Sequence, residues 1–130
     1  MSHSIKVVAA IISNNDKFLI AKRPNAKHQG GMWEFPGGKV ESNESNITAL
    51  YRECLEELDI RIAEPEHFDH IDFDYGDKKV SITFYRVFNF SGVAKGNEGQ
   101  EIIWATLCEL KEKILLKANK RIVNKLLKIG

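Results

Sequence analysis

The N-terminal part of the chain alternates between apolar runs and polar turns, as short strands do. Residues 7–12 are a continuous apolar run, and the polar residues 13–16 are typical of a tight turn. Residues 17–23 then match the second strand of a β-hairpin. After a polar loop, residues 33–35 read as a short extended piece. We expect it to end at residues 36–38, Pro-Gly-Gly, because proline and paired glycines break regular structure.

Residues 45–58 carry the pattern of an amphipathic helix. Ser45 is a suitable N-cap, because its hydroxyl can accept from a free backbone N–H of the first turn. At about 100° per residue, four side chains fall on one arc and are expected to face the core. They are Ile47, Leu50, Cys54 and Leu58.

The second half of the chain predicts another hairpin and a closing helix. Apolar and polar residues alternate in residues 68–75 and again in residues 80–90, as paired strands require. Residues 92–100 form a polar loop with glycines, and residues 101–104 resemble a short strand. Residues 119–129 predict an amphipathic helix with one apolar face, made of Ile122, Val123, Leu126 and Leu127.

Interleaved strands and helices predict an α/β (α+β) fold in which a mixed β-sheet is sandwiched between helices. The chain has 130 residues, which fit a single domain over residues 1–130. No internal repeat or Pro/Gly-rich linker divides the sequence. We therefore expect one compact unit.

Composition narrows the class of protein. The formal net charge is +1, so the molecule as a whole has no long-range attraction to nucleic acid or membrane. The two cysteines, Cys54 and Cys108, are too few for a disulfide framework and are each expected to be buried in a reducing compartment. The sequence shows no signal peptide and no apolar run of membrane-spanning length, which predicts a cytoplasmic protein.

Three glutamates share one face of the predicted helix. Glu53, Glu56 and Glu57 stand at positions i, i+3 and i+4, beside the apolar arc. Clustered carboxylates repel one another unless a cation neutralises them, and Mg²⁺ prefers oxygen ligands and bridges to substrate phosphates. The pattern is consistent with a magnesium platform. A solvated acidic face is the alternative that the helix alone leaves open.

Residues 38–60, GKVESNESNITALYRECLEELDI, resemble the Nudix box, written G-x5-E-x7-R-E-U-x-E-E-x-G-U with U an aliphatic residue. Cys54 takes the first aliphatic position and is small and apolar enough to pack there. Asp59 replaces the glycine past the helix end, where a left-handed backbone is usual. The matching positions are Gly38, Glu44, Arg52, Glu53, Glu56, Glu57 and Ile60.

The resemblance implies a Nudix fold and a pyrophosphohydrolase that uses Mg²⁺, with Mn²⁺ as an alternative cofactor. Water would attack a phosphorus atom while the metal stabilises charge on the diphosphate. By the same resemblance Arg52 orients a carboxylate, and Glu44 supports the loop-to-helix geometry or a water of the metal shell. The implied metal site comprises Gly38, Glu53, Glu56, Glu57 and Glu98.

Outside the box the similarity covers nearly the whole chain and indicates one branch of the family, the MutT-type 8-oxo-dGTP diphosphatases. Residues 35–39, FPGGK, look like the run that leads into the box in that branch. The branch has a further acidic residue at the position of Glu98 and a purine-reading asparagine at that of Asn119. The substrate-binding residues implied are Arg23, His28, Phe35, Gly37, Gly38, Lys39, Tyr75, Lys78 and Asn119.

Each of these residues also has a simpler interpretation. Asn119 could pair with an oxidised guanine that carries a proton on N7, or it could be only the N-cap of the last helix. Glu98 could be a metal ligand or only a solvated loop residue. Phe35 and Tyr75 could line a base pocket or belong to the core, and a lone loop histidine such as His28 is usually a bystander.

The cationic candidates leave the same choice open. Arg23 and Lys39 could contact phosphate oxygens or be exposed charges at strand ends, and Lys78 lies in a hairpin turn.

The leading hypothesis is hydrolysis of 8-oxo-dGTP to 8-oxo-dGMP and diphosphate, which would remove a mutagenic nucleotide from the pool. Hydrolysis of a pyrimidine triphosphate or a nucleoside diphosphate sugar is the nearest alternative. A non-catalytic Nudix-fold binding module is disfavoured because all the box carboxylates are present. Nucleic-acid binding by the lysine-rich residues 111–128 is disfavoured by the near-neutral net charge. We expect a monomer that acts on a small nucleotide, without a nucleic-acid or membrane partner.

Overall fold

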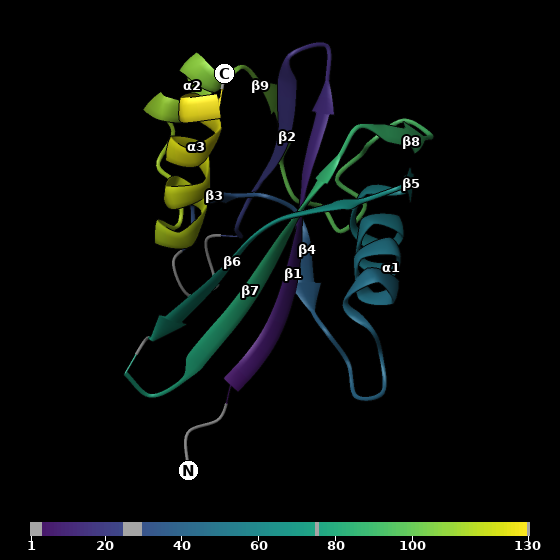
Figure 1. Ribbon diagram of the computed structural model, residues 1–130. Coiled ribbons are helices and arrows are strands. Elements are labelled where there is room, and N and C mark those ends of the chain that lie inside the picture. The colour runs from purple at the N-terminus through teal and green to yellow at the C-terminus, as the bar shows by residue number, and fades with distance from the viewer. Residues whose placement is uncertain (1–3, 25–29, 75, 130) are drawn as a thin grey trace.

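A twisted mixed sheet stands between helices on its two faces (Figure 1). The computed structural model describes residues 4–24, 30–74 and 76–129. α1 (Asn46–Leu58) covers one face, and α2 (Leu107–Glu112) and α3 (Lys117–Ile129) lie together against the other. The predicted sandwich of helices around a mixed sheet is confirmed.

The two predicted hairpins form the four longest strands of the sheet. Their strands are β1 (Ser4–Asn14), β2 (Lys17–Lys22), β6 (Glu66–Asp74) and β7 (Lys79–Val87). β1 pairs antiparallel with β2, and β6 pairs antiparallel with β7. β7 runs parallel to β1, with Ser4 opposite Lys79 and Ile12 opposite Val87, which makes the sheet mixed.

Shorter strands complete the sheet at its edges. β3 (Trp33–Glu34) and β9 (Ile102–Ala105) both pair with β2, close to where the sequence predicts extended segments. β5 (Arg61–Ala63) and β8 (Asn89–Ser91) pair with each other in a separate small sheet that the sequence did not predict. Strands of three residues are too short to show a hydrophobic period.

β3 ends before Pro36, as predicted, but the two glycines that follow are not irregular. They begin a new strand, β4 (Gly37–Lys39), which runs antiparallel to β1. Ala10 N donates to Pro36 O at 2.8 Å, so the proline sits beside β1 without having to donate to it. A Cβ at Gly37 would lie 1.9 Å from the carbonyl oxygen of Val8. The glycine therefore allows the two backbones to approach, instead of ending the strand.

α1 has the predicted ends. The Ser45 side chain accepts from Thr48 N at 3.1 Å, and Asp59 takes a left-handed backbone with φ of 58°. The predicted core arc is wrong at Ile47, which is 39% exposed, and Ala49 is buried in addition to the three other predicted residues. A helical angle specifies a face but not how far along the helix that face is covered.

The C-terminal part contains one helix more than predicted. Thr106 and Glu109 form a reciprocal capping box that starts α2. α3 begins at Lys117, so Asn119 lies inside the helix and the N-cap interpretation of this residue is wrong.

Two apolar cores lie on opposite faces of the sheet. Alternate residues of β1 divide between them: Ala9 and Ile11 face α2 and α3, and Ala10 and Ile12 face α1. Cys54 is buried as predicted, whereas the burial predicted for Cys108 is wrong, because this residue is exposed at the start of α2. None of the helices in the described segments is both long and apolar enough to span a bilayer.

The left-handed residue Asp59 generates a stability prediction. Replacing it by glycine should raise the free energy of unfolding by about 0.5–1 kcal/mol, because glycine adopts this backbone without steric strain. The exposed pair of Asp59 with Lys95, at 3.3 Å, offsets little of this gain. Urea denaturation measures the change. Asp59→Ala is the matched control and should unfold at lower urea than the wild type, and a D59G midpoint at or below the wild-type value would contradict the prediction.

Candidate functional site

A cavity of about 450 Å³ opens between the sheet, the C-terminal half of α1 and the start of α3. Most of the residues predicted for the site line it, although they come from strands, loops and both helices. They are Arg23, Phe35, Gly37, Gly38, Lys39, Glu53, Glu57, Lys78, Glu98 and Asn119. His28 and Tyr75 lie outside the described residues.

Two glutamates of α1 lie directly against the glycine backbone of β4. Gly37 N donates to Glu57 Oε2 at 3.1 Å. A Cβ at Gly38 would fall 2.4 Å from Glu53 Cδ and within 2.6 Å of both its carboxylate oxygens. Only glycine leaves room for these carboxylates at the cavity wall.

Arg52 holds the neighbouring acidic side chains in place. Its Nε and Nη2 donate to the two oxygens of Glu44 at 2.7 and 2.9 Å, and its Nη1 donates to Glu53 Oε1 at 2.9 Å. Nη1 also lies 3.3 Å from Glu56 Oε2, and Nη2 donates to Lys39 O at 3.0 Å. The hydrogen bonds from Arg52 lower the pKa of Glu44 to about 2. Glu44 does not line the cavity, so its contacts support a structural role.

The surroundings of the two cavity carboxylates of α1 raise their pKa values. Burial, followed by repulsion from Glu53, Glu98 and Glu34, raises the pKa of Glu57 to about 8. Burial also raises the pKa of Glu53, although Arg52 opposes the shift. A divalent cation reverses this balance by favouring both ionised forms.

Glu56 and Glu98 differ from the two inner carboxylates. Glu56 has a side chain that is 55% exposed and is not among the cavity-lining residues, so it stands at the outer side of the predicted triad. Glu98 is exposed and lines the cavity from the loop before β9. The predicted acidic set is therefore arranged as two inner and two outer groups.

Two amides that the sequence analysis did not single out fix the loop of Glu98. Asn97 Nδ2 donates to Glu56 O, and Gln100 Nε2 donates to Glu57 O, both at 3.0 Å. These carbonyls belong to the last turn of α1, where helix carbonyls lack partners within the helix. The sequence feature that could have predicted these contacts is the presence of Asn97 and Gln100 in a loop that returns to the end of α1.

The described residues contain no ready-made cage of three or more His, Cys, Asp or Glu groups for a metal. Mg²⁺ does not need one, because it keeps several waters and shares substrate phosphate oxygens. An open cavity with two half-buried carboxylates and an exposed third one fits that mode of binding.

Asn119 is 5% exposed and reaches across to the strand side of the cavity. Its Oδ1 accepts from Phe35 N at 2.8 Å, across 84 positions of sequence. This bond orients the amide so that Nδ2, which donates to none of the described residues, is available at the cavity. Phe35 belongs to the core and also lines the cavity, so the two interpretations of this residue are compatible.

The cationic candidates ring the opening. Arg23 forms an ion pair with Glu34 at 3.3 Å, and both residues line the cavity. Lys39 and Lys78 are exposed and contribute to the same lining. The structure therefore brings positive and negative side chains to the same cavity.

Comparisons with known proteins agree with this geometry. The family described as NUDIX domain matches residues 7–125. A CTP pyrophosphohydrolase of Escherichia coli is 38% identical over 102 residues, 78% of this chain and 76% of that protein. An 8-oxo-dGTP diphosphatase of Buchnera aphidicola is 35% identical over 102 residues, 78% of this chain and 82% of that protein.

Solved structures give the same result. One from a structural and functional study of MutT from Aliivibrio salmonicida and Vibrio cholerae has a TM-score of 0.87 and 38% identity, covering 98% of this chain and 100% of the other. Such similarity along the whole chain, together with the carboxylate helix against β4, shows that this chain belongs to the Nudix hydrolases and is of the MutT type.

Proposed function

We propose that this protein is a Mg²⁺-dependent pyrophosphohydrolase that converts 8-oxo-dGTP to 8-oxo-dGMP and diphosphate. One observation carries the proposal: the carboxylates of Glu53 and Glu57 and the amide of Asn119 line the same cavity. An acidic wall suits a metal–diphosphate complex, and a buried amide suits the edge of a base.

The residues present fit a divalent cation. Glu53 and Glu57 would hold it from α1, with the Gly38 carbonyl and Glu98 beside them and Glu56 at the outer side. Burial and the neighbouring carboxylates raise the pKa of Glu57 to about 8, and a bound cation would favour its ionised form. When bound, Mg²⁺, or Mn²⁺ in its place, would stabilise charge on the diphosphate and lower the pKa of an attacking water.

The chain's own groups position the substrate. Arg23, Lys39 and Lys78 line the cavity, and under this proposal they contact phosphate oxygens of the substrate. Arg52 does not line the cavity, so we assign it a positioning role through Glu53. Alignment of water, phosphorus and leaving group then supplies most of the rate, because little covalent chemistry falls to the protein.

The amide of Asn119 is suited to bind a guanine base that is oxidised at C8. With one lone pair of Oδ1 used by Phe35 N, the other can accept from a protonated N7 while Nδ2 donates to O6. Unmodified guanine has an acceptor at N7 and offers only the second of these bonds in that arrangement. The amide is therefore suited to select the oxidised base.

CTP is the second candidate, because the Escherichia coli relative named for that substrate is 38% identical to this chain. Cytosine also has a donor at N4, so the amide of Asn119 does not exclude it.

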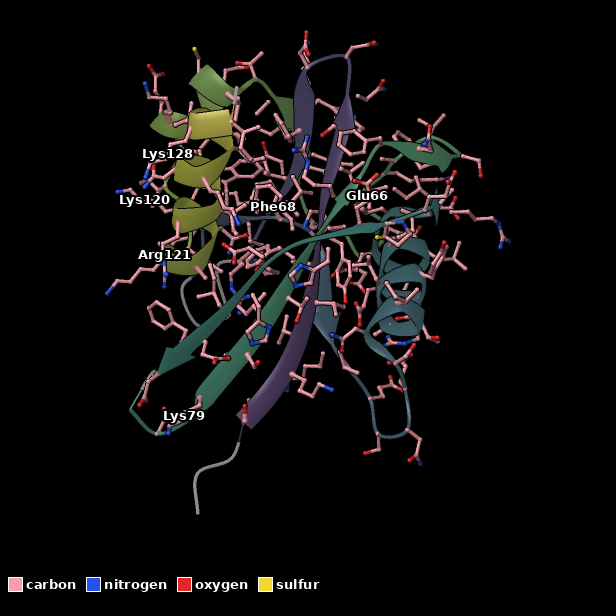
Figure 2. All side chains as sticks on the ribbon, viewed as in Figure 1. Glu66, Phe68, Lys79, Lys120, Arg121 and Lys128 are labelled. Atoms are coloured by element: carbon pink, nitrogen blue, oxygen red, sulfur yellow. The ribbon has the colours of Figure 1, made fainter. Side chains whose placement is uncertain are left out.

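We further propose a monomer, with residues 1–130 as one domain, that acts on free nucleotides in the cytoplasm. Lys120, Arg121 and Lys128 project from the outer side of α3, away from the sheet (Figure 2).

A nucleotide panel tests the substrate. Diphosphate release should require Mg²⁺, and kcat/KM should be at least about a hundredfold higher for 8-oxo-dGTP than for dGTP or CTP. The bond that only the oxidised base can donate from N7, together with the repulsion between Oδ1 and an unprotonated N7, can supply that selectivity against dGTP. Asn119→Ala should remove most of the preference, because 8-oxo-dGTP loses both base contacts whereas dGTP loses one. A higher kcat/KM for CTP would assign this chain the alternative substrate, and a uniform effect of N119A would refute the base-reading role.

The paired glycines of β4 give a matched test of the carboxylate wall. Gly38→Ala should lower kcat at least about tenfold with little loss of stability, because its Cβ displaces only the mobile end of Glu53. Gly37→Ala should instead lower the melting temperature, because its Cβ would collide with the backbone of Val8. Steady-state kinetics and thermal unfolding separate the two. A fully active G38A variant would contradict the role given to Glu53.

A further inference from the structure

A second cavity, of about 650 Å³, lies between the β1–β2 turn, the end of β7 and the start of α2. It shares none of its lining residues with the first cavity, which we propose binds the nucleotide and call the nucleotide cavity. Arg86 lines it from β7, two residues after Phe84, which lines the nucleotide cavity on the same face of the sheet. The proposed hydrolysis of a nucleotide therefore gives this second cavity no role.

Arg86 lies among three aromatic rings. Its guanidinium carbon is 4.6 Å from the ring centroid of Phe88, 5.6 Å from that of Phe68 and 5.8 Å from that of Phe18. Figure 2 shows Phe68 on the part of β6 that passes beside α3. Aromatic faces hold a guanidinium in place but do not accept its in-plane hydrogen bonds.

The charge of Arg86 has no ionic partner among the described residues. Among the residues that the structure describes, the Arg86 side chain forms one hydrogen bond, a long contact of 3.5 Å from Nη2 to Ser13 Oγ, and its buried Nε has no acceptor. Glu66 faces Arg86 in the strand register but forms no ion pair with it. Burial lowers the pKa of Arg86, and Glu66 opposes this only in part. Arg52, by contrast, reaches several carboxylates and a carbonyl.

A half-buried guanidinium with unused donors favours an oxyanion, because carboxylate and phosphate accept two parallel N–H bonds from it. Apolar side chains around the cavity favour a ligand with an apolar body. Phe88, which is 48% exposed, and Leu107, at the start of α2, both line the cavity. Asp16 in the hairpin turn also lines the cavity and disfavours ligands with several negative charges.

We propose that this second cavity binds a small organic anion whose single carboxylate or phosphate pairs with Arg86 and whose aromatic or aliphatic body packs on Phe88 and Leu107. The volume lies within the range that suits such ligands. The proposal does not depend on which nucleotide is hydrolysed, because it concerns separate residues.

The chain provides its own reporter for occupancy. Cys108 lines the second cavity and is exposed, whereas Cys54, the other cysteine, is buried. A maleimide should therefore label Cys108 alone in the folded protein. A ligand in the cavity should slow that reaction.

The test uses benzoate and phenyl phosphate as probes and benzyl alcohol as the uncharged control. Titration of the full chain, followed by the NMR signal of Arg86 Nε–H, should show saturable shifts with at least one anion and none with benzyl alcohol. The same anion should protect Cys108 from the maleimide. Comparison of the two anions distinguishes a carboxylate site from a phosphate site. No saturable shift with either anion would overturn the proposal.

Variants show whether Arg86 is responsible. Arg86→Gln should weaken anion binding about tenfold or more, and Arg86→Lys should weaken it less, because lysine keeps the charge but loses the planar fork. Asp16→Asn should bind equally or more tightly, and Asn119→Ala should bind as the wild type does. If R86Q does not fold, wild-type protein with a bulky maleimide adduct on Cys108 replaces it and should lose the shifts. Unchanged binding in R86Q, or in the adduct, would overturn the proposal.

Discussion

The contact between two glutamates of α1 and the glycine backbone of β4 determines the rest of the site. Glu53 and Glu57 pack closely against this backbone. A Cβ at Gly38 would overlap the Glu53 carboxylate, and Gly37 N donates a hydrogen bond to Glu57. Burial raises the pKa of both carboxyls, and repulsion from Glu53 raises the pKa of Glu57 further. Under the proposed function, a divalent cation with its bound phosphates would favour the ionised form of both carboxyls.

The remaining parts of the site maintain this contact. Arg52 donates hydrogen bonds to Glu44 and to the carbonyl of Lys39, and these bonds link α1 to the loop before it and to the end of β4. At the other end of α1, Asn97 and Gln100 bind the last-turn carbonyls and bring Glu98 to the cavity. The amide of Asn119 then joins α3 to the chain just before β4. Hydrogen bonds of this kind position catalytic groups without touching the substrate.

Sequence periodicity and spacing sufficed for the elements in which local signals agree. Helix α1 combines a serine cap, an apolar face and an acidic face within residues 45–59, so both its ends and its carboxylates were predictable. β4, β5 and β8 are three residues long and show no period, and their pairing depends on distant strands. Asn119 is a similar case, because its partner Phe35 lies 84 positions away and no local signal shows an unpaired N–H there. The exposure of Glu56 and Ile47 depends on how far the sheet extends along α1, which a helical wheel does not contain.

Calorimetry at pH 7 can measure whether magnesium binding is coupled to loss of the Glu57 proton. Because the pKa of Glu57 is raised to about 8, this carboxyl is mostly protonated at pH 7 and must lose its proton to hold a cation. Calorimetric titration in two buffers of different ionisation enthalpy should show release of about one proton per Mg²⁺, with affinity rising as the pH increases to about 8. Glu57→Gln should bind weakly and release no proton. Equal heats in the two buffers, or wild-type affinity in E57Q, would contradict the account.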